Sequence, residues 1–394
     1  MHSGHFSRRT FLISSAGLAL SQLIFAQQHK HGARDAPADQ GHDGDQWKQE
    51  ADQIVQAMLE NGHIPSAVIG VVKGGQVAYV KGYGVRKLPN GDVPDENTVY
   101  YIGSLSKALT AVGAMTLVQS GKLDLDSPAS QYIHDLPASW RDITVRQFMS
   151  HTSGIPDVPK RQKNAQDNIN GVYRLMDKLP MTSPPGTREQ YNNFNFAVTG
   201  NLIEVISGMS YVDFMKRSVF GPLGMDRTGI VLDPGNHATG YRLDVNGDPT
   251  ETDAQVLSFG IPSGGLATSV SDLLKLEDAL RSHKILQPKF MREMVQPVKG
   301  FASTPGWFTR NSPSGLVVSK NGAAVGFSSF FSFVPDTGDA PATVRLPIAL
   351  VRRFSGEGRA VPALEHRRDR EILARQVSGG LGRLRRLSCT ERAG

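Results

Sequence analysis

The sequence has almost no cysteine, and this scarcity limits the chemistry available to it. Its 394 residues contain one cysteine, Cys389, so no disulfide can form within the chain and no cysteine-based metal site can be built. The sequence also contains no metal-binding cluster and no phosphate-binding glycine loop. We therefore expect no cofactor, and the chemistry must come from other side chains.

The sequence also lacks a general excess of charge. Its formal net charge is +6, but the segment from Asp339 onward contains twelve arginines, no lysine and six acidic residues. The preceding residues are therefore neutral on balance, unlike a surface that binds phosphates. We expect no nucleic-acid partner. Binding of nucleic acid through the arginine-rich end is the alternative, and it would be steeply salt-dependent.

Long hydrophobic runs are absent as well. The most apolar stretch, "FLISSAGLALSQLIFA" (residues 11–26), is short and interrupted by serine and glutamine, which is unfavourable for a membrane span. Arg8 and Arg9 precede it, and this pair resembles a twin-arginine export signal. We predict that residues 1–26 are a signal peptide and that the protein is exported to the periplasm without a membrane span. An ordinary secretory signal would also export it.

The remaining pattern predicts a mixed α/β fold. Residues 27–45 have almost no apolar content and read as a flexible linker. A helical pattern over residues 47–59 is followed by two β-rich runs joined by Gly74-Gly75, a hairpin signal. Helices and loops dominate from about residue 125 to 300, and strands return at residues 315–335. We expect an antiparallel sheet from both chain ends, flanked by helices, with an inserted all-helical subdomain.

The stretch "YYIGSLSKALTAVG" (residues 100–113) contains the first candidate site. Ser104 and Lys107 share a helix face because they are three residues apart, whereas Ser106 points elsewhere. Burial at a helix start lowers a lysine pKa, and such a lysine can take the proton of a serine nucleophile. The alternative is that Lys107 extends to solvent and Ser104 caps the helix.

Two further motifs follow in the chain. "QYNNFNF" places Tyr191 and Asn193 before another helix, and "VVSKNGAAVGFSS" places Lys320 on a β run. Taken singly, these residues could be a packed aromatic, a helix cap and an exposed strand charge. Taken together, S-x-x-K, Y-x-N and K-x-G resemble the active site of the serine β-lactamase and penicillin-binding protein superfamily. The tyrosine in the second motif makes the pattern most similar to that of class C β-lactamases and their esterase relatives. The resemblance covers residues 47–335, and we place the domain at residues 46–338.

The resemblance implies a catalytic set. Ser104 would attack a carbonyl carbon and become acylated. Lys107 and Tyr191 would share the general-base work, with Tyr191 kept partly as a phenolate by the positive field of Lys107 and Lys320. The backbone amides of Ser104 and Ala323 would form the oxyanion hole.

The resemblance also implies a substrate-binding set. Asn193 would hydrogen-bond the substrate amide and the lysine of the first motif. Lys320 would support the tyrosine hydroxyl and attract a substrate carboxylate, beside Asn321 and Gly322. The third motif departs from the K-T-G of most lactamases at Asn321. His151, in "SHTSG", is similar to a structural histidine of this family, and no G-x-S-x-G motif supports a catalytic role for it.

The end of the chain departs from the family pattern. At residue 339 the composition changes to arginine, alanine, glycine and proline, where the family continues into a strand and a final helix. Our hypothesis is that a reading-frame shift replaced the native end within residues 339–394. The alternative is a divergent tail in which "RLPIALVRRF" still forms the strand.

The sequence thus predicts an exported serine hydrolase that forms an acyl-enzyme on Ser104. Its expected substrate is a small molecule: a β-lactam, a small ester or a D-amino-acid peptide. The alternative is a non-catalytic protein that recognises penicillin or binds peptidoglycan, or an inactive family member.

Overall fold

A computed structural model of the protein describes residues 46–62, 64–157, 169–230, 235–244, 246, 248–252, 258–312, 315–335, 346–352 and 354–356. The predicted signal peptide (residues 1–26) and linker (residues 27–45) lie outside these ranges, as do residues 357–394 of the arginine-rich segment. Among the described helices, none combines the length and the apolarity that crossing a bilayer requires.

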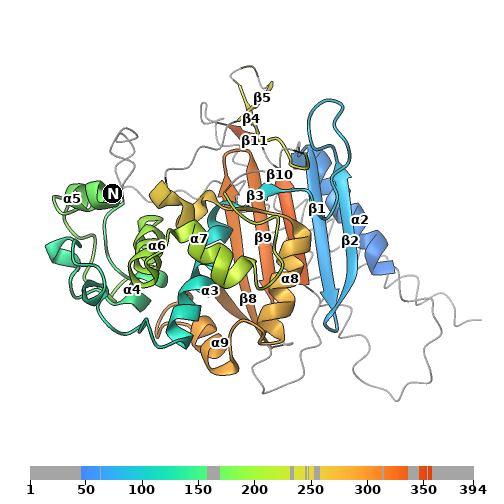
Figure 1. Ribbon diagram of the computed structural model, residues 1–394. Coiled ribbons are helices and arrows are strands. Elements are labelled where there is room, and N and C mark those ends of the chain that lie inside the picture. Colours follow the sequence, from blue (N-terminus) through green and yellow to red (C-terminus); the bar gives the residue numbers. More distant parts are fainter. Residues whose placement is uncertain are drawn as a thin grey trace, which may run out of the picture. The chain divides into compact units, whose positions relative to one another are not determined.

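A six-stranded antiparallel sheet forms the centre of the fold (Figure 1), with the strand order β2-β1-β10-β9-β8-β7. The first two strands of the chain lie at one side of the sheet, and strands from beyond residue 300 supply the rest. The strands are β1 (Ser66–Lys73), β2 (Gln76–Gly84), β7 (Phe308–Ser312), β8 (Gly315–Ala324), β9 (Phe327–Phe333) and β10 (Leu346–Arg352). The mixed α/β fold with an antiparallel sheet from both chain ends, as the sequence predicts, is confirmed.

Strand β1 shows why this sheet is covered on both faces. Successive side chains of a strand point to opposite faces. Ala67, Ile69 and Val71 pack with α2 (Gln46–Gly62), whereas Val68 and Val72 join the main core. The sheet is therefore a layer between α2 on one face and the helices of the main core on the other (Figure 1). The predicted Gly74-Gly75 turn joins β1 to β2, and both glycines have a positive φ.

Strand β10 lies between β1 and β9 and belongs to the arginine-rich segment. Its backbone is antiparallel to both neighbours, with Ala349 opposite Ile69 on one side and Phe330 on the other. The sheet therefore continues past residue 338, where the composition of the sequence changes. Its next strand, β11 (Phe354–Gly356), is parallel to β4 in a separate three-stranded sheet.

Helices and short strands occupy the chain between β2 and β7. Figure 1 shows α4, α5 and α6 away from the sheet, whereas α3 and α8 lie beside it. The helices are α3 (Ser106–Gln119), α4 (Val145–Met149), α5 (Ile169–Met176), α6 (Phe194–Ser207), α7 (Tyr211–Met215), α8 (Val270–Arg281) and α9 (Pro288–Val295). The short strands are β3 (Tyr100–Tyr101), β4 (Tyr241–Leu243), β5 (Pro249–Glu251) and β6 (Ala267–Thr268).

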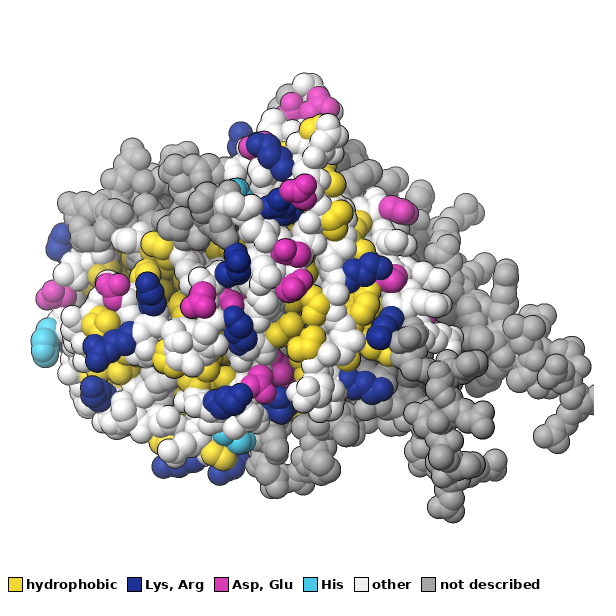
Figure 2. All heavy atoms as spheres, turned by 45° about the vertical axis from the view of Figure 1, so that its right-hand side comes forward, with side chains coloured by type: hydrophobic (Ala, Val, Ile, Leu, Met, Phe, Trp, Pro, Cys, Tyr) yellow, Lys and Arg dark blue, Asp and Glu magenta, His cyan; other side chains and the backbone are white. Residues whose placement is uncertain are grey.

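Basic and acidic side chains are interspersed on the face shown in Figure 2. Ion pairs of the described residues include Lys81 with Asp52 and Lys87 with Glu251, each at 2.9 Å. Such pairs contribute little to stability. They do prevent a field of one sign on this part of the surface.

Candidate active site

The first motif lies where a short 3-10 helix, η1 (Gly103–Leu105), runs into α3. The Ile102 amide donates to the Leu266 carbonyl at 3.0 Å, which anchors the chain just before this turn. The hydroxyl of Ser106 accepts from the Leu266 amide at 3.1 Å, so this side chain faces away from Lys107, as the spacing predicts. Ser104 does not cap α3, because the cap position is Leu105 and no side chain bonds the helix end.

Lys107 is fully buried at the start of α3. Its Nζ atom lies 3.3 Å from Oγ of Ser104, and it donates to Oδ1 of Asn193 at 2.8 Å and to the Ser263 carbonyl at 2.5 Å. The alternative in which Lys107 reaches solvent is therefore excluded. The amine of Lys107, from the first motif, therefore contacts Asn193 of the second motif and the carbonyl of Ser263, which belongs to neither motif.

Burial changes the protonation of both lysines. The pKa of Lys107 is lowered well below its usual value by burial and, secondarily, by the charge of Lys320. Burial also lowers the pKa of Lys320 to about 7, although the charge of Glu189 opposes the shift. Because a low-dielectric environment disfavours a charged amine, burial favours the neutral form of Lys107.

The pKa of Tyr191 is shifted away from the phenolate that the family resemblance implies. Burial raises this pKa to about 12, and the nearby Ser104 hydroxyl offsets the shift only in part. Lys107 and Lys320 place their Nζ atoms over its ring, 4.9 and 5.3 Å from the ring centre. Among the described residues, none forms a hydrogen bond with its Oη atom. Burial thus favours the protonated phenol, and both lysines face the ring of Tyr191 instead of bonding its hydroxyl.

Asn193 occupies the cap position of α6 but does not use its side chain as a cap. The helix end is bonded by Asn192 instead, whose Oδ1 accepts from the Phe194 amide at 2.7 Å. The side chain of Asn193 is thus free of the helix and accepts from Lys107. The second motif divides its work: one asparagine holds the helix and the other reaches the lysine.

Strand β8 approaches η1 so closely that only glycine fits at the contact. A Cβ atom on Gly322 would lie 1.9 Å from the Ile102 carbonyl oxygen, and one on Gly103 would lie 2.7 Å from the Ala323 nitrogen. Gly103 also has a φ of +51°, which glycine adopts readily. The backbone of Ala323 therefore lies beside the turn that carries Ser104. Ser104 and Ala323 are the two positions predicted for the oxyanion hole. Asn321 lies on the same strand, opposite Phe330.

The residues of the site differ in their exposure to solvent. Ser104 is half-buried, and Asn193 and Ala323 are exposed, whereas Lys107 and Lys320 are buried. The two amines are therefore shielded from water beside residues that solvent contacts.

The structure adds Ser263 and Phe308, which the sequence analysis did not predict, and it places the histidine of the "SHTSG" motif beside Tyr191. Ser263 supplies a carbonyl to Lys107. Phe308 lies under the Nζ atom of Lys320, 4.3 Å from its ring centre. The ring centre of His151 lies 4.4 Å from that of Tyr191. The Gly264-Gly265 pair after Ser263 could have indicated a close backbone contact in the sequence, since a Cβ atom on Gly264 would lie 3.7 Å from the Gly103 backbone. No local sequence pattern indicates Phe308.

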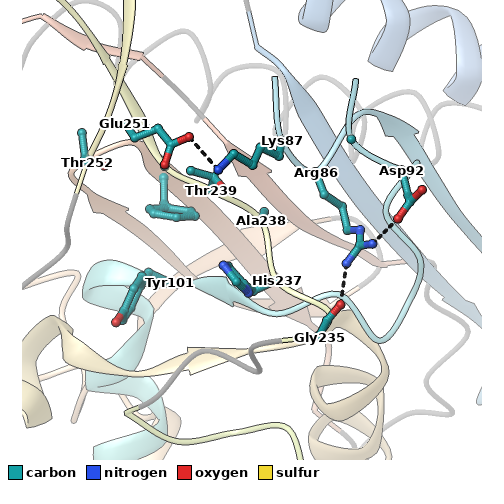
Figure 3. Close-up of a pocket in the computed structure, with 13 residues that line it drawn as sticks. Arg86, Lys87, Asp92, Tyr101, Gly235, His237, Ala238, Thr239, Glu251 and Thr252 are labelled. Carbon is teal, nitrogen blue, oxygen red and sulfur yellow. Dashed lines mark hydrogen bonds and ion pairs between the residues drawn. The ribbon is translucent and has the colours of Figure 1, made fainter. Parts of the chain in front are cut away.

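A separate cavity of about 620 Å³ is shown in Figure 3. None of the predicted site residues lines it, and Tyr101 of β3 borders it. The Arg86 guanidinium pairs with Asp92, and Lys87 pairs with Glu251 at 2.9 Å. Its charged side chains are thus paired with one another. The described residues contain no group of three or more side chains able to hold a metal ion.

Comparisons with known proteins identify similar chains. Protein flp of Staphylococcus aureus is 28% identical over 305 residues, which cover 73% of this chain and 61% of that protein. A penicillin-binding protein of Bacillus subtilis is 28% identical over 298 residues, covering 68% of this chain and 65% of the relative. The chain thus spans less than two thirds of the length of these curated relatives.

Solved structures show the same fold. The octameric penicillin-binding protein homologue from Pyrococcus abyssi superposes with a TM-score of 0.68 at 24% identity, covering 78% of this chain and 74% of that one. A class C beta-lactamase superposes with a TM-score of 0.69 at 21% identity, covering 82% and 95%. The Beta-lactamase family model matches residues 51–374. The chain belongs to the beta-lactamase family.

Proposed function

We propose that this protein is a serine hydrolase that forms an acyl-enzyme on Ser104. The observation that carries the proposal is the environment of Lys107, whose buried Nζ atom lies 3.3 Å from the Ser104 hydroxyl. A serine hydroxyl is a weak nucleophile until a base accepts its proton. A buried lysine with a lowered pKa is such a base.

The hydrogen bonds of Lys107 leave one position for the serine proton. A neutral amine has two N–H groups and one lone pair. The two N–H groups are used by Asn193 Oδ1 and by the Ser263 carbonyl. The lone pair is then left to accept the proton of Ser104, and the same two partners stabilise the ammonium that results.

Acylation follows from this arrangement. The Ser104 proton passes to Nζ of Lys107 while Oγ bonds to the substrate carbonyl carbon. The developing oxyanion would accept from the backbone amides of Ser104 and Ala323; the approach of the Ala323 backbone to Gly103, the residue before Ser104, supports this assignment. One such donor contributes on the order of 3 kcal/mol to transition-state stabilisation.

Tyr191 is the acid of this step. Its pKa of about 12 keeps the phenol protonated at neutral pH, and it gives its proton to the leaving atom as the carbonyl carbon–leaving atom bond breaks. The phenolate then lies near the Lys107 ammonium. In deacylation a water molecule gives its proton to this phenolate and attacks the acyl carbon, while Lys107 returns its proton to Ser104. Every group regains its resting protonation.

The proposed substrates are β-lactams, small esters and D-amino-acid peptides. The names of the relatives favour a β-lactam as the first compound to test. Lys320, buried on β8 with a pKa of about 7, would gain its proton when a carboxylate binds beside it. The paired arginines near the start of the sequence support export to the periplasm, where such compounds act. The alternative is a protein that recognises penicillin or peptidoglycan without turnover.

Labelling with a fluorescent penicillin tests the proposal. The wild-type protein should carry a covalent label that survives denaturation, and Ser104→Ala should carry none. Ser106→Ala is the matched control, because its hydroxyl bonds the Leu266 amide and not Lys107; it should be labelled like the wild type. Label on Ser104→Ala, or none on the wild type, would contradict an acyl-enzyme at this serine.

Turnover separates the remaining possibilities. A chromogenic cephalosporin and a p-nitrophenyl ester should be compared with the same preparation. Steady release of product from either identifies a hydrolase and its preferred substrate class. Stoichiometric labelling without release identifies the non-catalytic alternative.

A further inference from the structure

The group that the mechanism leaves unused beside the reacting atoms is His151. It is 3% exposed and lies at the end of α4, where its amide donates to the Phe148 carbonyl at 3.2 Å. Its φ of +59° is left-handed, a conformation that costs energy in any residue with a Cβ atom. Backbone strain of this kind clusters at functional positions, so it indicates a role for the His151 side chain.

His151 bonds the chain on both sides of Tyr191. Its carbonyl accepts from the Gln190 amide at 2.8 Å, and its Nδ1 atom accepts from the Asn192 amide at 3.3 Å. Its ring centre lies 4.4 Å from that of Tyr191, with 41° between the ring planes. One residue thus fixes the backbone before the tyrosine, the backbone after it and the face of its ring.

The surrounding hydrogen bonds define which nitrogen of His151 carries the proton. Ser153 donates to Oδ1 of Asn195 at 2.6 Å, so the Asn195 Nδ2 group is oriented to donate to Nδ1 of His151 at 3.1 Å. With two donors directed at it, Nδ1 is an acceptor and the proton is on Nε2. This ring must stay neutral to hold Asn192. Burial is the main reason that its pKa lies well below the usual value.

Tyr191 depends on this support because the nearby Ser104 hydroxyl acts on its own hydroxyl only weakly. Within the part of the chain that the structure describes, its Oη atom has no hydrogen-bond partner. The direction of the phenol is therefore set by the ring and the backbone, which His151 holds. A displacement of about 1 Å in a reacting group lowers a rate by roughly 100-fold.

We propose that His151 is a positioning residue that aims the Tyr191 hydroxyl at the substrate through the two backbone bonds and the ring contact. This inference rests on the proposed function, because it assigns a task to a residue that supports the acyl-enzyme chemistry. His151 neither touches the substrate nor exchanges a proton.

A double-mutant cycle with p-nitrophenyl acetate tests the inference. The burst of p-nitrophenol reports acylation, and the later steady rate reports deacylation, which needs Tyr191. His151→Ala should lower the steady rate by roughly 100-fold in the wild-type background. In the Tyr191→Phe background the same change should have less than about a threefold effect, because no hydroxyl remains to be aimed.

Two control variants and the contradicting outcomes complete the design. His151→Asn tolerates the left-handed backbone and can accept from Asn192 through its side-chain oxygen, so it should recover part of the loss; it also serves if His151→Ala does not fold. His134→Ala, at an exposed histidine, should match the wild type. Equal losses in the wild-type and Tyr191→Phe backgrounds, or no loss in either, would overturn the inference. A wild-type protein without a burst or a penicillin label would instead overturn the proposed function.

Discussion

The Nζ atom of Lys320 lies over the ring of Tyr191, 5.3 Å from the ring centre, and forms no hydrogen bond with the phenol oxygen. The contact is a cation–π geometry when Lys320 is charged. Since the pKa of Lys320 is about 7 and that of Tyr191 is about 12, the resting pair at neutral pH is a partly charged amine and a neutral phenol. In the proposed reaction Tyr191 therefore acts first as the general acid of acylation, and it acts as a base only after it has lost its proton.

Tyr191→Phe should therefore affect substrates according to their leaving groups. Acylation by a p-nitrophenyl ester should stay within about tenfold of the wild type, because p-nitrophenolate leaves without a proton. Acylation by penicillin should fall by roughly 100-fold or more, since the ring amine must be protonated. Stopped-flow measurement of both acylation rates checks this. If both rates fall equally, Tyr191 is instead the base for Ser104.

Lys320→Met should stabilise the protein at neutral pH. Lys320 is 1% exposed, and its pKa of about 7 lies below the usual 10.5. Between these values the unfolded chain binds more protons than the folded chain, so wild-type stability rises with pH through this window. The variant should gain roughly a few kcal/mol in the free energy of unfolding at pH 7 and below, and nothing near pH 10.5.

Urea unfolding of Lys320→Met at several pH values measures this gain. Lys284→Met is the matched control, because the Lys284 side chain is 62% exposed. It should change stability by about 0.5 kcal/mol or less. An equal gain in both variants, or none in Lys320→Met, would show that burial does not penalise the charge of Lys320.

Gly322→Ala should separate β8 from η1. The added Cβ atom would lie 1.9 Å from the Ile102 carbonyl oxygen and 2.7 Å from the Leu105 amide, both backbone atoms. We expect a loss of about 2 kcal/mol in the free energy of unfolding and a roughly 100-fold slower penicillin labelling. Gly229→Ala is the control, because its Cβ atom would meet nothing within 4 Å. Normal labelling of Gly322→Ala would show that the two amides need not adjoin.

Truncation should distinguish the two parts of the arginine-rich segment. A chain ending at Gly356 keeps β10, so it should unfold cooperatively and be labelled by penicillin. A chain ending at Pro335 lacks the strand between β1 and β9, and should aggregate because two unpaired strand edges are exposed. Thermal unfolding by circular dichroism and sedimentation of the soluble fraction compare them. A folded, labelled chain ending at Pro335 would show that β10 is dispensable.

The origin of the arginine-rich segment is a question about the gene. The composition changes at residue 339, yet residues 346–352 form a strand within the sheet. The reading-frame shift stays a hypothesis, and resequencing the coding DNA across this junction tests it. An intact frame would leave the divergent tail as the explanation.

Local patterns in the sequence predicted much of the fold. The apolar run from Ala67 to Val72 predicts a strand, which the structure shows as β1 between two apolar layers, and Gly74-Gly75 supplies the positive φ angles of the hairpin. The spacing of Ser104 and Lys107 places them on one face because it approximates one helical turn. Each of these features depends only on neighbouring residues, so the sequence determined them by itself.

The tertiary structure alone decided the protonation of the site. Lys107 meets Asn193 and Ser263, which are 86 and 156 residues away in the chain, and their packing removes water from its amine. The same burial keeps Tyr191 a phenol. A pKa depends on solvent access and on charges that distant elements bring together, and neither quantity is encoded in the spacing of a motif.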